Sequence, residues 1–91
     1  MMMEVAEAEV EVKPSSPGQV LRAAREAKAW KVEHVASQLK LSRRQIEALE
    51  ADAFTELPGL TFVRGFVRNY ARLLEVDAEP ILALLDRHAS P

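Results

Sequence analysis

The stretch LPGLTFVRGFVRNYARLL, residues 57–74, brings together side chains suited to binding another protein. Phe62 and Phe66 are spaced so that on a helix they lie one turn apart on the same edge. Polar residues fill the remaining face of this predicted helix: Arg64, Arg68, Asn69 and Arg72. Aromatic and arginine side chains are enriched where protein interfaces concentrate their binding energy. The pattern alone leaves a second interpretation open, in which both rings belong to the core.

A second group, Ser42-Arg43-Arg44-Gln45, has side chains that can read base edges in DNA. Arginine pairs with guanine and glutamine with adenine in the major groove. The same residue types are also ordinary on a protein surface. Acidic residues follow on the same predicted helix, at Glu47 and Glu50, where they would face phosphates at a cost. DNA reading is therefore the alternative function and not the first.

Catalytic chemistry has few candidate residues in this chain. Cysteine is absent, which excludes disulfides and thiolate metal sites. His34 and His88 are isolated in the sequence and match no metal-ligand spacing. The three glycines are dispersed and form no phosphate-binding loop. We expect no enzymatic activity, no bound metal and no cofactor.

The charge distribution permits an acidic partner without requiring nucleic acid. The formal net charge is −2, but the charges are unevenly placed. Residues 18–74 hold ten Lys/Arg against six Asp/Glu, whereas residues 1–17 and 75–91 are each net acidic. A mildly basic body between acidic ends favours acidic partners. An ordinary solvated surface would give the same counts.

Hydrophobic periodicity predicts the helices that would position these residues. Val32, Val35, Ala36 and Leu39 follow the i, i+3, i+4, i+7 spacing of one buried helix face. The predicted helices span about 17–28, 32–39, 43–51, 61–74 and 78–88, with a loop at 52–60 in which Phe54 and Leu57 anchor to the core. The second and third helices form a helix-turn-helix. The expected fold is all-α, a compact five-helix bundle.

Capping residues support these boundaries. Ser16 with Gln19, and Ser42 with Gln45, have the spacing of capping boxes. Asp77 is placed to cap the last helix.

The chain divides into three parts by composition. Residues 1–15 alternate Glu with Val and Ala and are expected to be a disordered acidic leader. Residues 16–88 form the helix-turn-helix domain, and residues 89–91 are expected to be a frayed tail. No apolar run approaches the ~20 residues that cross a bilayer, and the acidic start does not resemble a signal peptide.

The helix at 61–74 carries more apolar surface than a small bundle needs, because its apolar arc covers close to half of the cylinder. The residues favoured for the core are Val63, Val67, Tyr70, Ala71 and Leu74. The apolar surface beyond what this core needs is the edge that carries Phe62 and Phe66. Arg25 and Glu50 are expected to pair as part of the architecture.

The motifs resemble known helix-turn-helix proteins. G-x-x-L-R-x-A-R-E at 18–26, V-A-x-x-L-x-L at 35–41 and I-x-A-L-E at 46–50 resemble the Cro/repressor-type helix-turn-helix family. The stretch at 61–74 is similar to the cytoplasmic N-terminal domain of the RodZ family of bacterial cell-shape proteins. The F-x-R-G-[FY]-x-R-x-Y-A positions that carry this likeness are Phe62, Arg64, Gly65, Phe66, Arg68, Tyr70 and Ala71. The resemblance covers residues 18 to about 87.

The RodZ resemblance implies a module that binds the actin-like filament protein MreB and not DNA. In that family two aromatics one turn apart on the fourth helix make much of the contact, and they match Phe62 and Phe66. The predicted partner-binding set also includes the nearby polar residues Arg64, Arg68 and Asn69. The second aromatic is often tyrosine in the family, so Phe66 lacks the hydrogen bond of that hydroxyl.

The resemblance also bears on location. RodZ proteins continue into a basic juxtamembrane stretch, a transmembrane helix and a periplasmic domain. We therefore expect a monomeric cytoplasmic domain that does not itself touch the membrane. It is either part of a longer chain tethered to the cytoplasmic face of the inner membrane or a stand-alone relative. The alternative is a sequence-specific DNA-binding transcriptional regulator that contacts DNA through Ser42, Arg43, Arg44 and Gln45.

Overall fold

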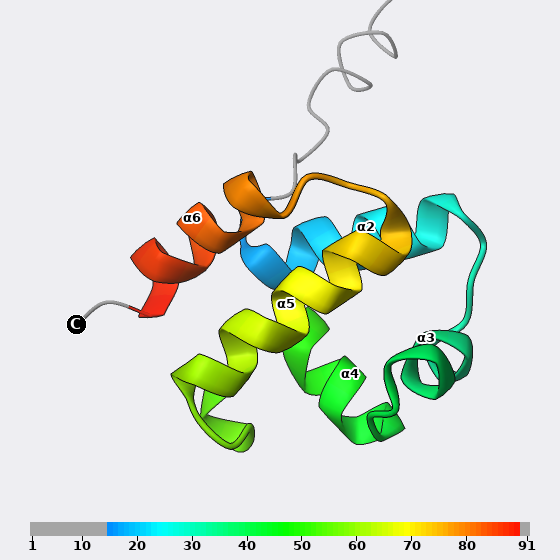
Figure 1. Ribbon diagram of the computed structural model, residues 1–91, viewed down its shortest axis with the longest axis horizontal. Coiled ribbons are helices and arrows are strands. Elements are labelled where there is room, and N and C mark those ends of the chain that lie inside the picture. Colours follow the sequence, from blue (N-terminus) through cyan, green and yellow to red (C-terminus); the bar gives the residue numbers. More distant parts are fainter. Residues whose placement is uncertain (1–14, 90–91) are drawn as a thin grey trace, which may run out of the picture.

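Every regular element between residues 15 and 89, the range that the computed structural model describes, is helical. In chain order they are α2 (Pro17–Ala27), α3 (Val32–Leu39), α4 (Arg43–Glu50), the 3-10 turn η1 (Phe54–Glu56), α5 (Leu60–Leu74) and α6 (Ala78–Ala89) (Figure 1). Within residues 15–89 the predicted all-α class with five α-helices and a helix-turn-helix, here α3 and α4, is confirmed.

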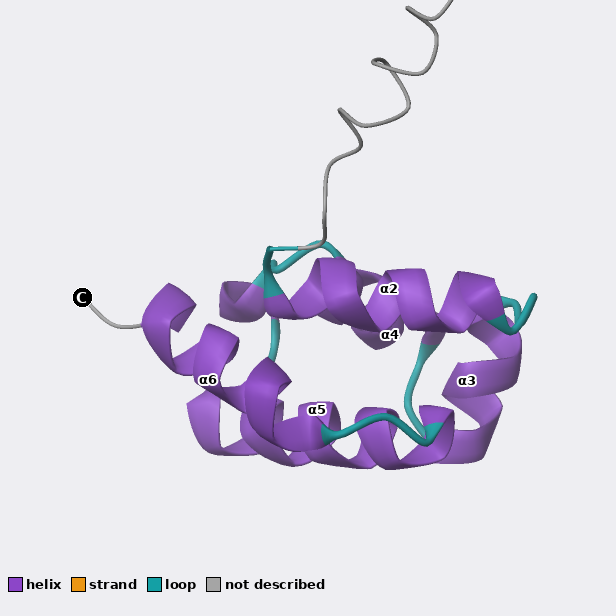
Figure 2. Cartoon of the chain, turned by 90° about the horizontal axis from the view of Figure 1, so that it is seen from above, coloured by secondary structure: helices purple, strands orange, loops and turns teal. Residues whose placement is uncertain are grey.

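Helix α5 supplies much of the core. Seen from above, α5 and α2 run in two layers, with α3 at one end of the molecule and α6 at the other (Figure 2). The side chains that are at most 1% exposed and apolar are Leu21, Val35, Ile46, Leu49, Val63, Val67, Tyr70, Ala71, Leu74 and Leu85. The set includes every residue of α5 that the sequence assigned to the core. Helix α5 is therefore the element against which α2, α3 and α6 pack.

The segment between α4 and α5 differs from its prediction. The sequence predicted a loop over 52–60, but Phe54–Glu56 form a 3-10 turn and α5 begins one residue earlier, at Leu60. Phe54 packs against the core and Leu57 is buried, as the sequence predicted for both. Because Phe54 and Leu57 are close in the sequence and both pack inward, the chain between them forms a tight turn. The Leu57 N–H closes this turn by donating to the Phe54 carbonyl at 3.1 Å.

The helix caps match the sequence with one exception. Ser42 and Gln45 form a complete capping box, and the Asp77 carboxylate accepts from the Glu79 N–H at 3.0 Å. At α2, the Ser16 hydroxyl accepts from the Gln19 N–H as predicted. The reciprocal half of that box is wrong, because the Gln19 side chain accepts from the Ser15 N–H at 2.9 Å. The glutamine thus reaches back one residue further than the predicted cap.

Asp52 ties the start of α2 to the end of α4. One oxygen of its carboxylate accepts from the Ser16 hydroxyl at 2.6 Å and the other from the Gly18 N–H at 2.8 Å. At Gly18 the backbones approach so closely that a Cβ atom would lie 2.4 Å from the Leu49 carbonyl oxygen. Glycine is required here by this approach of two backbones.

The expected leader at 1–15 and tail at 89–91 fall almost wholly outside the described residues. Only Ser15 and Ala89 belong to both, and α6 extends to Ala89.

Candidate protein-interaction site

Two phenylalanines form a ring pair on one edge of α5. Phe62 is 57% exposed, and Phe66 is half-buried with part of its ring against the core. The ring centroids lie 6.1 Å apart with the planes tilted by 43°. This separation is within the range of favourable aromatic contacts. Phe66 therefore fixes the position of a ring that is otherwise largely in solvent.

The edge extends further along the helix than the ring pair. Phe62, Phe66, Asn69 and Leu73 follow the spacing i, i+4, i+7 and i+11, which places them in one stripe on a helix of 3.6 residues per turn. Asn69 is exposed and Leu73 is half-buried. We call these four residues the α5 stripe. The prediction placed Asn69 on the polar face of this helix, although steps of 100° per residue place it beside Phe62.

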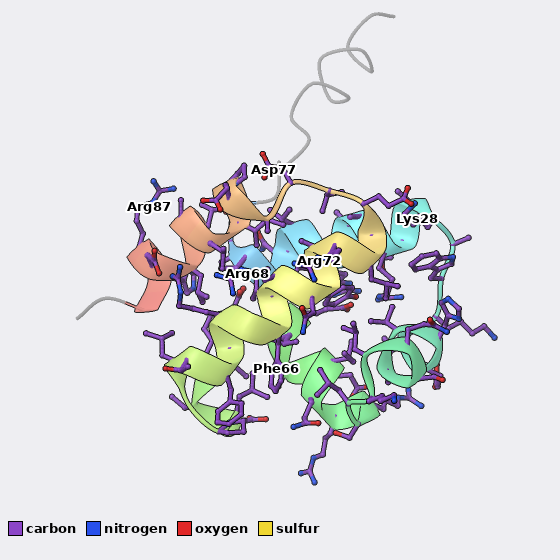
Figure 3. All side chains as sticks on the ribbon, viewed as in Figure 1. Lys28, Phe66, Arg68, Arg72, Asp77 and Arg87 are labelled. Atoms are coloured by element: carbon purple, nitrogen blue, oxygen red, sulfur yellow. The ribbon has the colours of Figure 1, made fainter. Side chains whose placement is uncertain are left out.

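The predicted arginines do not join this stripe. Arg64 lies two residues from Phe62, so it points to nearly the opposite side of α5. There it pairs with Asp86 on α6. Arg68 is exposed, and Figure 3 shows it on the opposite side of α5 from Phe66. The structure brings Phe62, Phe66 and Asn69 together and separates Arg64 and Arg68 from them.

The residues predicted to read DNA have other partners, with one exception. The Ser42 hydroxyl and the Gln45 amide are occupied with each other's backbone N–H groups, at 3.0 and 2.9 Å. Arg43 contacts Glu47 at 2.9 Å and Glu33 on α3 at 2.7 Å. The hydrogen bond to Glu47 and the charge of Glu33 raise the pKa of Arg43 above its ordinary value.

Arg44 is the exception among these four. It is exposed, and it makes no ion pair with any residue between 15 and 89. A helix that enters the major groove needs several free side chains along one face. Among the four predicted residues, Arg44 is the one whose side chain has no hydrogen bond or ion pair within residues 15–89.

A buried polar network clamps α2, α4 and α5 together. Arg25 donates to both oxygens of Glu50, from Nε at 2.7 Å and from Nη2 at 3.0 Å, and to the Trp30 carbonyl at 2.8 Å. Tyr70, the buried tyrosine of α5, donates its hydroxyl to the same carboxylate. The Arg25–Glu50 pair is confirmed, and Tyr70 is an additional member.

The network changes the acidity of its members. Burial, reinforced by the hydrogen bond to Glu50, raises the pKa of Tyr70 well above its ordinary value. The hydrogen bond with Glu50 raises the pKa of Arg25, although burial acts in the opposite direction. Tyr70 is therefore a neutral donor and Arg25 a permanent cation at any physiological pH.

The histidines have surroundings typical of surface residues. His34 makes an edge contact with Trp30 at 4.8 Å between centroids, and His88 makes one with Phe54 at 6.1 Å. Within residues 15–89 no three His, Cys, Asp or Glu side chains gather in a way that could hold a metal ion. No helix in that part of the chain has the length and hydropathy to cross a membrane.

The comparisons with known proteins agree with this architecture. A family model described as a helix-turn-helix domain matches residues 20–81, so the chain belongs to the helix-turn-helix domain family. Over 69 residues the chain is 32% identical to a protein of Streptococcus pneumoniae (strain ATCC BAA-255 / R6) named Cytoskeleton protein RodZ. The predicted likeness to RodZ is thereby confirmed.

That likeness covers only part of the relative. The matched residues make up 76% of this chain and 25% of the pneumococcal protein, so the chain spans about a quarter of the length of the curated relative it matches. No solved structure matches the chain significantly. The chain is therefore a helix-turn-helix domain of the RodZ type.

Proposed function

We propose that this chain is a protein-binding adaptor that docks the actin-like filament protein MreB through the edge formed by Phe62 and Phe66. The observation that carries the proposal is the exposure of Phe62, which is 57% in solvent although it makes a tilted contact with the ring of Phe66, itself packed against the core. A positioned aromatic ring of this kind binds a partner with little loss of side-chain freedom. Asn69, on the same stripe, adds a hydrogen-bonding group.

Arg68 acts in this proposal through the field it creates, whereas Arg64 is paired with Asp86 and adds little to that field. Arg68 lies around the helix from the rings, so it steers an acidic filament surface toward α5 and does not fill the contact itself. In an intact protein that continues into a membrane anchor, the adaptor couples filaments to the cytoplasmic face of the inner membrane. The likeness to a cytoskeleton protein supports this role.

The test compares two apolar residues in the first turns of α5. Phe62→Ala removes the proposed contact, while Leu60→Ala removes an apolar side chain of similar exposure, 49%, from another side of the helix. Co-sedimentation with MreB filaments measures binding. We expect Phe62→Ala to bind about 30-fold more weakly, which corresponds to a hot spot of ~2 kcal/mol. Leu60→Ala should bind like the wild type, and circular dichroism should show both variants folded.

Two results would contradict the proposal. One is unchanged binding by Phe62→Ala, and the other is an equal loss by Leu60→Ala, which would move the contact to another surface. Fluorescence anisotropy with duplex DNA tests the alternative function. Because most of its proposed reading residues are already paired, we expect no binding at low salt. Binding that falls steeply with salt and is lost in Arg44→Ala would instead favour the DNA regulator.

A further inference from the structure

The α5 stripe ends in a groove against α3. Six residues line this groove, from the end of α3, the turn that follows it and the last turns of α5: Gln38, Leu39, Lys40, Asn69, Arg72 and Leu73. Its volume is about 420 Å³. Two of its residues, Asn69 and Leu73, are also members of the stripe, so the groove continues the ring-bearing edge.

The polar side chains that line the groove are all cations or amides. Lys40 and Arg72 are cations, and Gln38 and Asn69 carry amide N–H donors. No carboxylate lines the groove. Leu39 and Leu73, both half-buried against the core, provide its apolar part. Cations and amide donors around an apolar floor match a carboxylate side chain with its aliphatic stem.

The two cations are available for a partner. Both are exposed, and neither has an ion pair within residues 15–89. By contrast, Arg43 and Arg64, the comparable arginines of α4 and α5, are paired with acids of this chain. Figure 3 shows Arg72 extending from the later half of α5.

The backbone holds Lys40 in place. Lys40 adopts a left-handed conformation, φ 59°, and its N–H bonds back to carbonyls of the last turn of α3. The following residue, Leu41, packs against the core. The backbone therefore fixes the point beside α5 from which the Lys40 side chain extends.

We infer that this groove receives an acidic side chain of the protein docked on Phe62 and Phe66. The inference rests on the proposed function, because the stripe places the groove within the same footprint. The aromatic end supplies most of the affinity, and the Lys40–Arg72 end fixes the direction in which the partner lies along α5. Charge pairs at the edge of an interface set orientation and association rate more than total affinity.

The experiment compares two double variants of equal net charge. Lys40→Gln/Arg72→Gln neutralises the groove, and Arg44→Gln/Arg87→Gln removes two exposed charges from α4 and α6. Binding to MreB filaments is measured at low and moderate salt by co-sedimentation. We expect the groove variant to bind roughly three- to tenfold more weakly at low salt and to lose much of the salt dependence of the wild type. The control variant should change neither quantity.

The outcomes separate the two proposals. If Phe62→Ala weakens binding as expected while the groove variant matches the control variant, the groove inference is wrong and the docking edge stands. If the groove and control variants weaken binding equally, general charge explains the effect and the groove inference is again wrong. If the wild type does not bind filaments at all, both proposals fall.

Discussion

Replacing Glu50 by glutamine tests whether the buried network holds the helices together. The carboxylate accepts two hydrogen bonds from Arg25 and one from Tyr70, and its side chain is only 7% exposed. Glu50→Gln keeps the shape but removes the charge, and it turns an NH₂ group toward the guanidinium or the phenol. One of these donors then loses its acceptor, and Arg25 keeps only the exposed Glu26, at 4.0 Å, as an acidic partner.

The expected cost follows from these contacts. Breaking a buried ion pair by removing one partner costs about 3–5 kcal/mol. A surface hollow lined by Arg25 and Glu50 lets water reach the site, and the amide still accepts one hydrogen bond, so the loss should be nearer 2–3 kcal/mol. A domain of about 75 ordered residues has roughly 4–11 kcal/mol of stability in total. Glu50→Gln should therefore remain folded with a much smaller margin.

Urea unfolding measures this loss. Trp30, the single tryptophan, provides fluorescence, and its carbonyl accepts from Arg25, so it reports directly on the network. With a denaturant dependence of about 1 kcal/mol per molar urea, the midpoint should fall by about 2–3 M. Circular dichroism should give the same midpoint if unfolding is two-state.

A double-mutant cycle separates the ion pair from general damage. Arg25→Met should also destabilise, because it leaves the Glu50 charge partly buried with Tyr70 as its remaining partner. In Arg25→Met/Glu50→Gln both charges are absent and the amide still accepts from Tyr70. The double variant should then be at least about 1 kcal/mol more stable than the sum of the single losses predicts. Additive losses, or a Glu50→Gln loss below about 0.5 kcal/mol, would refute the network as the clamp of these helices.

Two further predictions follow from the packing. Because the pKa of Tyr70 is raised by folding, its phenol ionises more readily in the unfolded chain. The contribution of Tyr70 to stability should therefore be constant below pH ~10 and fall above it by up to about 1.4 kcal/mol per pH unit. Urea titrations of Tyr70→Phe should lack the loss of stability at alkaline pH that Tyr70 causes. An equal alkaline loss in the wild type and in Tyr70→Phe would show that other groups cause it. Gly18→Ala should destabilise by about 1–3 kcal/mol, since its methyl would press on the Leu49 carbonyl. Gly65→Ala is the matched control, because Gly65 lies in the middle of α5 with open space around an added Cβ. Thermal melts of both variants should show that Gly65→Ala stabilises the domain by up to ~1 kcal/mol. A change of the same sign at both sites would contradict the close approach of the backbones at Gly18.

Much of the fold could be predicted because its signals are local. The boundaries of α3 and the capping box of α4 follow from residues within four positions of one another. Helical spacing favoured the core face of α5 but left open whether Phe62 and Phe66 belong to it, and all five of its predicted members are buried. The 3-10 turn at Phe54–Glu56 was not predicted, because it depends on where Phe54 and Leu57 meet helices distant in sequence.

Less of the candidate site than of the fold could be predicted from the sequence. Spacing placed Phe62 and Phe66 on one edge but could not show which ring is exposed, since this depends on how the other helices pack against α5. The structure leaves Phe62 largely in solvent and half-buries Phe66. The groove at Lys40 and Arg72 was missed entirely. It is formed by two helices that are separated in the chain by α4, and no spacing within either one indicates it.

The arginines show why residue type alone overstates a binding surface. By sequence, Arg43 and Arg64 are as suited to an acidic partner as any other cation of the chain. In the fold each meets an acid of a neighbouring helix, Glu33 on α3 and Asp86 on α6. Such a pair presents almost no net charge, and a partner must compete with the internal acid to use the arginine. A steering field therefore comes mainly from cations that folding leaves without an internal acid. On α5 these are Arg68 and Arg72, so any acidic partner should be drawn to the later half of the helix before its aromatic contact forms.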